Sequence, residues 1–320
     1  MKRFTIMIRL LSRTIRKRAD YMILIVNTVI PIFFIAAIGW VFGKRIDFSL
    51  EMPARMTLYV FTPCLFFSSI LNAELQISDF GPIFLFSILL FLISTALAYL
   101  VSKVLRFTRQ KRNALFLSSC FPNSGNYGLP MVLFAFEQAG FERAIVFAMF
   151  QVLLINSAGV YFASHNSRSV IKSIKTILSF PGFIAVLLAV FIKWTAITIP
   201  VPILRPIHLL GQASVPTLLI ILGIQLARIK IVSDYRFLIT ASALRLLSYP
   251  VVGLVLAISI FGAESLSTQV LFLISASPTG ITPALLAERY GTEPGLVSAA
   301  TFVTTALSII TVPVVLVLIS

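Results

Sequence analysis

Two short stretches decide how this chain folds. Residues 122–130 read Pro-Asn-Ser-Gly-Asn-Tyr-Gly-Leu-Pro, and residues 277–283 read Ser-Pro-Thr-Gly-Ile-Thr-Pro. Each stretch places two prolines around glycine and hydroxyl or amide residues in the middle of a long apolar run. A proline inside a helix removes a backbone hydrogen bond and clashes with the preceding turn, and glycine weakens a helix further. The two stretches therefore predict two interrupted helices.

The composition indicates a membrane protein. Hydrophobic residues make up 58% of the 320 residues and charged residues 12%, whereas soluble globular chains carry about 25% charged residues. The formal charge of +15 raises the question of a nucleic-acid partner, but the 26 Lys and Arg residues cluster between apolar runs instead of forming one face. Cytoplasmic membrane loops collect basic residues in this way, so we expect membrane lipid, not nucleic acid, as the environment.

The apolar runs are long enough to cross a bilayer many times. A helix needs about 20 apolar residues to cross ~30 Å of hydrocarbon. Ten stretches qualify, so we predict an all-α polytopic protein with ten transmembrane helices. The predicted spans are 22–43, 53–72, 82–105, 113–137, 143–164, 174–194, 207–227, 237–262, 268–288 and 294–319. In the fourth and ninth spans about 10 residues, or ~15 Å of helix, precede each break, which places the breaks near the bilayer midplane.

The charges of the connectors predict an orientation. Lys and Arg gather in the connectors 44–55, 103–112, 168–175 and 228–236, whereas acidic residues gather in the alternate connectors. Because basic residues resist translocation, we expect the first set to face the cytoplasm and both termini to lie outside.

Residues 1–21 disagree with this orientation, since they hold seven basic residues. They form a separate basic segment, interpreted as an amphipathic interfacial helix, a targeting presequence, or a stretch upstream of a natural start at Met22. We favour the interfacial helix or the upstream-start artefact over an inverted topology.

The chain also repeats itself at an offset of about 150 residues. The order of prolines and glycines recurs: Pro63 corresponds to Pro216, Pro130 to Pro283, and Gly140 to Gly291. Such residues are scarce inside helices, so their ordered recurrence is informative. Five spans per half is an odd number, which inverts the second half. We predict two inverted five-helix repeats, 22–164 and 174–320, joined by a short cytoplasmic linker, 165–173.

The paired breaks are the predicted substrate site. Non-helical backbone at this depth must be buried in protein or line a wet cavity. Each restarted half-helix points its N-terminus, with about +0.5 charge, toward the centre, which favours an anion. The predicted substrate-binding residues are Asn123, Ser124, Gly125, Asn126, Asn156, Ser277, Thr279, Gly280 and Thr282, and the predicted crossover or hinge residues are Pro122, Pro130, Pro278 and Pro283.

Other polar residues inside the spans leave alternatives open. Gln151 and Asn156 favour helix-to-helix hydrogen bonding, although Asn156 is also a candidate for the cavity. Arg245 is a functional candidate by its position, and we favour a guanidinium that snorkels to the interface. Glu137 and Glu288 end the broken helices, as gates or as solvated ends.

The sequence contains no arrangement typical of catalysis. It has no Ser/His/Asp or Cys/His grouping, no phosphate-binding loop and no metal-ligand spacing around its two Cys and two His. We therefore predict neither an enzyme nor a catalytic residue, metal or cofactor. No acidic residue is plainly buried in the membrane, so the sequence does not choose between H⁺ coupling, Na⁺ coupling and uniport.

At the first break the sequence resembles a known family. The motif Asn123-Ser-Gly-Asn126-Tyr-Gly128-Leu-Pro130 is similar to the signature of the auxin efflux carrier family, PIN-related permeases of bacteria and plants. Supporting pieces are Thr62-Pro63-Cys-Leu-Phe-Phe, Gly223-Ile-Gln-Leu, Ser277-Pro-Thr-Gly280 and Tyr290-Gly291. The likeness extends from about residue 22 to the C-terminus.

This resemblance implies a ten-helix fold of two inverted repeats, with crossed broken helices four and nine beneath the site and a scaffold that often forms dimers. Members of the family move small organic anions, including auxin, malonate and malate. Only residues 164–175 separate the fifth and sixth spans, whereas the plant carriers have a long hydrophilic loop there. A bacterial permease of the inner (plasma) membrane is therefore the closer match.

Taken together, we expect a secondary transporter that moves a small organic anion, such as a mono- or dicarboxylate, by alternating access. We expect a homodimer through a scaffold made of spans one, two, six and seven. A sodium-coupled organic-anion symporter of the bile-acid-transporter type is the main alternative. A membrane-embedded enzyme is a more distant one.

Overall fold

The chain folds into helices. The computed structural model describes residues 2–46, 49–164, 180–229, 232 and 234–319, without the side chains of residues 2–21 and Ile77. Within these ranges there is no β-strand, and two extended residues, Pro122 and Thr279, form an isolated antiparallel bridge. The all-α prediction is confirmed. The interpretations of residues 1–21 and of the linker 165–173 concern parts whose side chains or backbone lie outside the described residues.

The helices, in chain order, are α1 (Lys2–Arg45), α2 (Glu51–Met56), η1 (Thr57–Phe61), α3 (Thr62–Leu71), η2 (Ile77–Asp79), α4 (Phe80–Val104), α5 (Arg109–Ser119), η3 (Ser124–Gly128), α6 (Leu129–Leu154), η4 (Ile155–Gly159), α7 (Val160–Ser164), α9 (Pro181–Trp194), α10 (Val201–Gln212), α11 (Ser214–Arg228), α12 (Tyr235–Ala243), η5 (Leu244–Ser248), α13 (Tyr249–Phe261), α14 (Leu266–Ser275), α15 (Ile281–Tyr290) and α16 (Pro294–Ile319). η1, η3, η4 and η5 are π-helical segments, and η2 is a 3₁₀ turn.

Seven helical segments of the described chain are long and apolar enough to cross a membrane. They are Met22–Arg45, Glu51–Leu71, Phe80–Val104, Ser124–Ser164, Val201–Arg228, Tyr235–Phe261 and Pro294–Ile319. Two shorter apolar helices, α9 and α14, accompany them. The chain is thus an integral membrane protein.

In the described chain, fewer helical segments are long enough to span a membrane than the ten predicted helices, and the difference has physical reasons. α5 and α14 each end at a break after 11 and 10 residues, so neither reaches the length of a span. The segment 124–164 joins two predicted spans, because helical hydrogen bonding resumes across a kink at Glu137 (φ 52°, ψ −150°). The first part of the predicted span 174–194 lies outside the described residues, which leaves α9.

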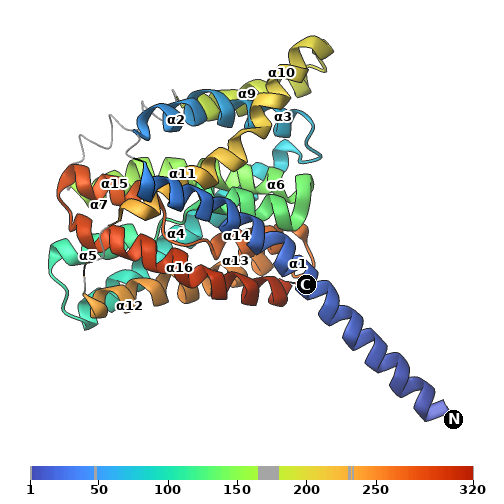
Figure 1. Cartoon of the computed structure of the whole chain (residues 1–320), viewed down its shortest axis with the longest axis horizontal. Helices are drawn as coiled ribbons and strands as arrows, with labels where there is room; N and C mark the ends of the chain where they lie inside the picture. The colour runs from blue at the N-terminus through green and yellow to red at the C-terminus, as the bar shows by residue number, and fades with distance from the viewer. Residues whose placement is uncertain (1, 47–48, 165–179, 230–231, 233, 320) are drawn as a thin grey trace.

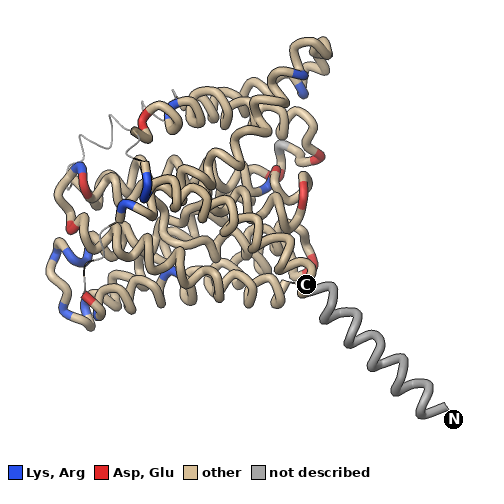
Figure 2. The backbone as a smooth tube through the Cα atoms, viewed as in Figure 1, with Lys and Arg blue, Asp and Glu red and all other residues tan. Residues whose placement is uncertain are grey.

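The helices form two groups (Figure 1). In what we call the flank group, residues 22–71 and 181–228, α3 packs against α9 and α10, and α1 packs along α11. α1 also packs against α6 and α16, and in Figure 1 α1 and α11 lie closer to these helices than the layer of α2, α3, α9 and α10 does. In the core group, residues 80–164 and 235–319, α14 packs against α6 and α13, and α4 packs against α13 and α5. Charged residues lie mostly at the two ends of the bundle: Lys and Arg gather where α5 and α12 begin, and acidic residues are frequent at the opposite end (Figure 2).

Glycines set the closest helix contact of the flank group. A Cβ atom on Gly223 of α11 would overlap the carbonyl oxygen of Ala36 in α1, and one on Gly39 would overlap the carbonyl oxygen of Ile220. One turn further along α1, a Cβ on Gly43 would lie 2.9 Å from the Cα of Ile224. Small residues let membrane helices approach backbone to backbone, where packing replaces the hydrophobic effect as the driving force. α1 and α11 therefore meet without side chains between them.

We expect Gly223→Ala to destabilise the protein by ~1–3 kcal/mol, because overpacking forces the two helices apart. The measurement is the melting temperature of the detergent-purified protein. Gly81→Ala is the matched control, since Gly81 in α4 has no atom within 4 Å of the added Cβ position. Equal losses in the two variants would show that α1 and α11 do not depend on this close approach.

Candidate functional site

The two interruptions that the sequence predicts are present, and they pair with each other. α5 ends at Ser119 and helix resumes at Ser124, while α14 ends at Ser275 and α15 begins at Ile281. Between these ends, the N–H of Asn123 donates to the carbonyl oxygen of Pro278 at 2.8 Å, and the N–H of Gly280 donates to that of Phe121 at 3.0 Å. The exposed backbone of each break is therefore satisfied by the other break.

The first break begins earlier than the prolines and asparagines of its motif suggest. Helical backbone stops at Cys120, and Asn123 is already the N-cap of the restarted helix. Pro283 lies in the first turn of α15, where the missing N–H of a proline does no harm, whereas Pro130 lies further inside the restarted helix, directly after the π-helical segment η3. Pro122 and Pro278 are the prolines within the paired segments.

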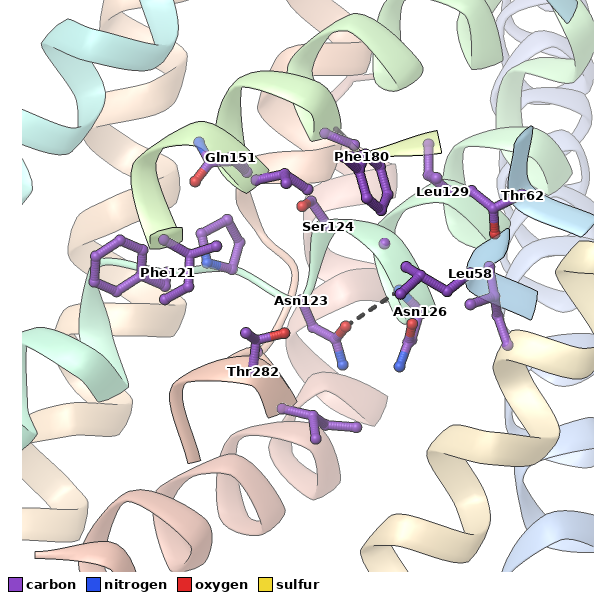
Figure 3. Close-up of a pocket in the computed structure, with 18 of the residues that line it drawn as sticks. Leu58, Thr62, Phe121, Asn123, Ser124, Asn126, Leu129, Gln151, Phe180 and Thr282 are labelled. Carbon is purple, nitrogen blue, oxygen red and sulfur yellow. Dashed lines mark hydrogen bonds between the residues drawn. The ribbon is translucent and has the colours of Figure 1, made fainter. Parts of the chain in front are cut away.

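A cavity of about 500 Å³ lies against this crossover (Figure 3). One wall comes from the flank group, and the other from the two breaks and from the helix that contains η4. The lining residues are Leu58, Tyr59, Thr62, Phe66, Phe121, Pro122, Asn123, Ser124, Gly125, Asn126, Leu129, Ala148, Gln151, Val152, Ile155, Asn156, Phe180, Pro181, Leu218, Gly280, Ile281, Thr282 and Pro283. None of them is Lys, Arg, His, Asp or Glu, so any charge selectivity must come from helix ends and amides.

The structure brings seven of the nine predicted substrate-binding residues to this cavity: Asn123, Ser124, Gly125, Asn126, Asn156, Gly280 and Thr282. Ser277 and Thr279 differ, because their side chains point into the protein. The Thr279 hydroxyl donates to the carbonyl oxygen of Ser118 at 2.5 Å, and its N–H donates to Thr304 Oγ1 at 3.1 Å. Ser277 is fully buried beside Gly128. In an extended segment alternate side chains face opposite ways, which sends these two to the protein side.

Asn123 presents a hydrogen-bond donor that has no partner among the described residues. Its Oδ1 accepts the backbone N–H of Asn126 at 3.3 Å, the contact dashed in Figure 3. Because an N–H can only donate, the atom that faces it must be the oxygen, and the amide NH₂ is the free end. This Nδ2 is buried and unbonded, in a residue only 5% exposed. A buried donor without a partner is costly, and a ligand acceptor in the cavity would satisfy it.

The start of α15 adds further donors. Its N-cap, Gly280, supplies no side-chain cap. The first N–H groups of a helix lack intrahelical acceptors, and Pro283 has no N–H, so Ile281 and Thr282 provide the free donors next to the cavity. The positive end of the helix dipole lies there as well. Together with Asn123, this end of the cavity offers N–H groups and no negative charge.

Gln151 is a cavity residue that sequence reasoning assigned to helix packing. It is 4% exposed, lines the cavity, and its amide lies next to the Tyr249 hydroxyl. Asn156 instead donates to the carbonyl of Val152 in its own helix at 2.9 Å. Spacing along the helix could not separate the two, because η4 is a π-helical segment that shifts the register of its side chains.

π-helical segments recur around the cavity. η1 contributes Leu58 and Tyr59, η3 contributes Ser124 to Asn126, and η4 contributes Ile155 and Asn156. Such segments occur frequently at functional sites, because the wider turn frees carbonyls and redirects side chains. No residue pattern in the sequence predicts these π-helical segments.

The side chain of Arg245 contacts both broken helices at the residues where their first halves end. The side chain is fully buried, so the snorkelling interpretation is wrong. Its Nη1 donates to the carbonyl oxygen of Ser119 at 3.1 Å and its Nη2 to that of Ser275, while the guanidinium lies 3.5 Å from the ring centroid of Tyr249. Ser119 and Ser275 are the last residues of α5 and α14. One fixed cation thus compensates the negative ends of both half-helices.

Comparisons with known proteins place the chain in a family of membrane transport proteins. A family model described as "Membrane transport protein" matches residues 24–171 and 164–316. An uncharacterized transporter of Methanocaldococcus jannaschii is 25% identical over 301 residues, covering 89% of this chain and 96% of that protein. An uncharacterized transporter of Methanothermobacter thermautotrophicus is 27% identical over 300 residues, covering 90% and 96%. A putative malonate transporter of Rhizobium meliloti is 25% identical over 306 residues, covering 90% and 93%.

We expect Arg245→Met to lower the melting temperature well below that of the wild type, because it leaves two buried carbonyls at a cost of ~1–3 kcal/mol each. Arg245→Lys should fall between the two, since an ammonium keeps the charge but lacks the planar fork that binds two acceptors. Arg205→Met is the control, an exposed arginine of α10. A wild-type melting temperature for Arg245→Met would contradict its role in joining α5 and α14.

Proposed function

Because the chain belongs to the auxin efflux carrier family of membrane transport proteins, we propose that it is a secondary transporter for a small organic anion. The observation that supports this most is the cavity at the crossover, where the Asn123 NH₂ and the start of α15 offer donors without protein partners. Its charge-free lining gives no counter-ion that would suit a cationic substrate.

A carboxylate fits the chemistry of this cavity. Its oxygens accept hydrogen bonds only, and the Asn123 NH₂, the Asn126 amide and the Ser124 and Thr282 hydroxyls are the donors nearby. Hydrogen bonds to an ionised acceptor are roughly twice as strong as those between neutral groups. Apolar residues such as Phe121, Leu129 and Phe180 would exclude water and strengthen them.

Malonate is the substrate we propose to test first. The Rhizobium meliloti relative is named a putative malonate transporter, and its similarity runs over 90% of this chain. A cavity of about 500 Å³ has room for a dicarboxylate together with part of its hydration shell. We extend the proposal to short mono- and dicarboxylates as a class.

The proposed architecture is ten helices in two inverted repeats, residues 22–164 and 174–320. The packing supports it, since exchanging the halves turns the contact of α1 with α11 into the contact of α9 with α3. The two hydrogen bonds at the crossover are related in the same way, each running from one break to the other. In this arrangement α5 to α6 and α14 to α15 are the fourth and ninth helices.

The proposed mechanism is alternating access in the inner membrane. The core group carries the crossover and moves against the flank group, which acts as the scaffold and as the contact of a homodimer. The cavity between the two groups supports a substrate that is held by both. In the proposed orientation both termini lie outside, and the end rich in Lys and Arg faces the cytoplasm, in keeping with Figure 2.

We expect malonate to raise the melting temperature of the purified protein, since a ligand that binds only the folded state stabilises it. Dimethyl malonate, which has the same skeleton without the charges, should have no effect. Stabilisation by both compounds would contradict selection for an anion.

We expect Asn126→Ala to reduce malonate uptake into proteoliposomes at least about tenfold, which corresponds to ~1.4 kcal/mol or one hydrogen bond to a charged group. The substitution removes a half-buried cavity amide and keeps the backbone N–H that orients Asn123. Asn72→Ala is the matched control, an exposed asparagine at the end of α3. Uptake at wild-type rate in the Asn126 variant would remove this residue from the site.

A further inference from the structure

Glu142 is a buried carboxylate that sequence reasoning placed among the solvated connectors. The residue is 2% exposed, within the segment that continues α6 beyond the kink at Glu137. Its Oε2 accepts the backbone N–H of Glu74 at 3.1 Å, and the N–H of Leu75 also bonds to the carboxylate. Glu142 is thus buried in protein, at the start of the predicted span 143–164.

The Glu142 carboxylate links the two helix groups. Residues 73–76 form the connector that follows α3 of the flank group, whereas Glu142 belongs to the core group. Lys193 of α9 holds the same connector from the flank side, donating to the carbonyl oxygen of Ala73. Of these contacts, only that of Glu142 must break if the core group moves away from the connector.

This contact lies at one end of the interface between the two groups. Ile70 of the flank group and Ala73 and Leu75 of the connector are buried in one apolar cluster with Phe141 and Ile145 of the core group. At the other end of the cavity wall, Leu58 is 41% exposed and Tyr59 is 59% exposed. Buried apolar residues thus lie on both sides of the interface at the Glu142 end, whereas Leu58 and Tyr59 of the cavity wall are exposed.

No ion pair holds Glu142 among the described residues, where salt bridges join Arg55 to Glu51 and Lys111 to Asp234. The cations whose charges act on the carboxylate are Arg143 on its own helix and Lys193 on α9.

Both cations are hydrogen-bonded elsewhere: Arg143 donates to Ser267 Oγ at 3.0 Å and to the carbonyl oxygen of Ala139 at 2.6 Å, and Lys193 to Ala73. From the connector, Glu74 faces solvent and Asp79 accepts the N–H of Gln76.

We propose that Glu142 is a proton-operated latch that keeps this end of the transporter closed while it is ionised. The ionised carboxylate accepts the two backbone N–H groups of the connector. A proton taken from the solvent removes the negative charge and turns one oxygen into an O–H donor, which leaves one good acceptor for two N–H groups and weakens their hydrogen bonds. The connector is then held less firmly, and acidification shifts the protein toward a state that is open at this end. In the proposed orientation, the latch lies on the outer face.

This inference rests on the proposed function for its meaning, since a latch matters only if the groups move, but its test needs no substrate. Hydrogen–deuterium exchange, read by mass spectrometry on the full chain in phosphatidylcholine nanodiscs, reports the amides of residues 73–76. Rates at pH 5 and pH 8 are compared after correction for the intrinsic pH dependence of exchange.

We expect wild-type exchange in this connector to be roughly tenfold faster at pH 5, and Glu142→Gln to exchange fast at both pH values, because a neutral amide does not reproduce a carboxylate bound by two N–H groups. Glu137→Gln, which changes an exposed glutamate of the same helix, should behave as the wild type.

Exchange in the wild type that does not change with pH would overturn the latch, as would slow exchange in Glu142→Gln. If Glu142→Gln does not fold, the comparison of the wild type at the two pH values still decides. A protein that passes this test and takes up no malonate retains the latch and loses the proposed substrate, so the two failures are separable.

Discussion

Hydrocarbon supplies no hydrogen-bond partners, and the rest of this structure follows from that constraint. A helix that breaks inside a bilayer exposes N–H and C=O groups that cost several kcal/mol each when they are left unpaired. Here the two breaks lie together, and Asn123 and Gly280 donate across to the carbonyls of Pro278 and Phe121. Arg245 takes up carbonyls at the ends of both preceding half-helices. Among the described residues, the Asn123 NH₂ is a buried donor left without a partner next to the cavity.

Local chemistry made part of this arrangement predictable. Proline and glycine act on the backbone around them, so the interruption of two helices and the cavity residues that belong to the breaks could be predicted from residues 122–130 and 277–283. Apolar length gave the membrane-spanning character for the same reason. Whether the side chains of Ser277 and Thr279 point into the cavity or into the protein could not be predicted. It depends on how a short extended segment pairs with another segment far along the chain.

The charged residues show where sequence reasoning stops. Arg245 lies inside the predicted span 237–262 and Glu142 next to the start of another, and a charge that reaches solvent is the usual outcome for such long side chains near a span end. Both are buried instead, because partners far along the chain supply the matching groups: Ser119 and Ser275 for the arginine, Glu74 for the glutamate. The cavity position of Gln151 and the π-helical segments were likewise not predicted from the sequence, because they depend on helical register and tertiary packing.

The distance along the chain between partners also bears on how the protein is made. The ribosome delivers α1 and the first break long before α11 and the second break, so Gly39 and Phe121 must wait for Ile220 and Gly280. Until then a nascent half-protein holds unpaired backbone at the depth of the lipid tails, where only other protein or water can shield it. Biogenesis therefore has a natural checkpoint after α15 is inserted. A chaperone or insertase that releases the chain before that point would release a half that the bilayer cannot accommodate.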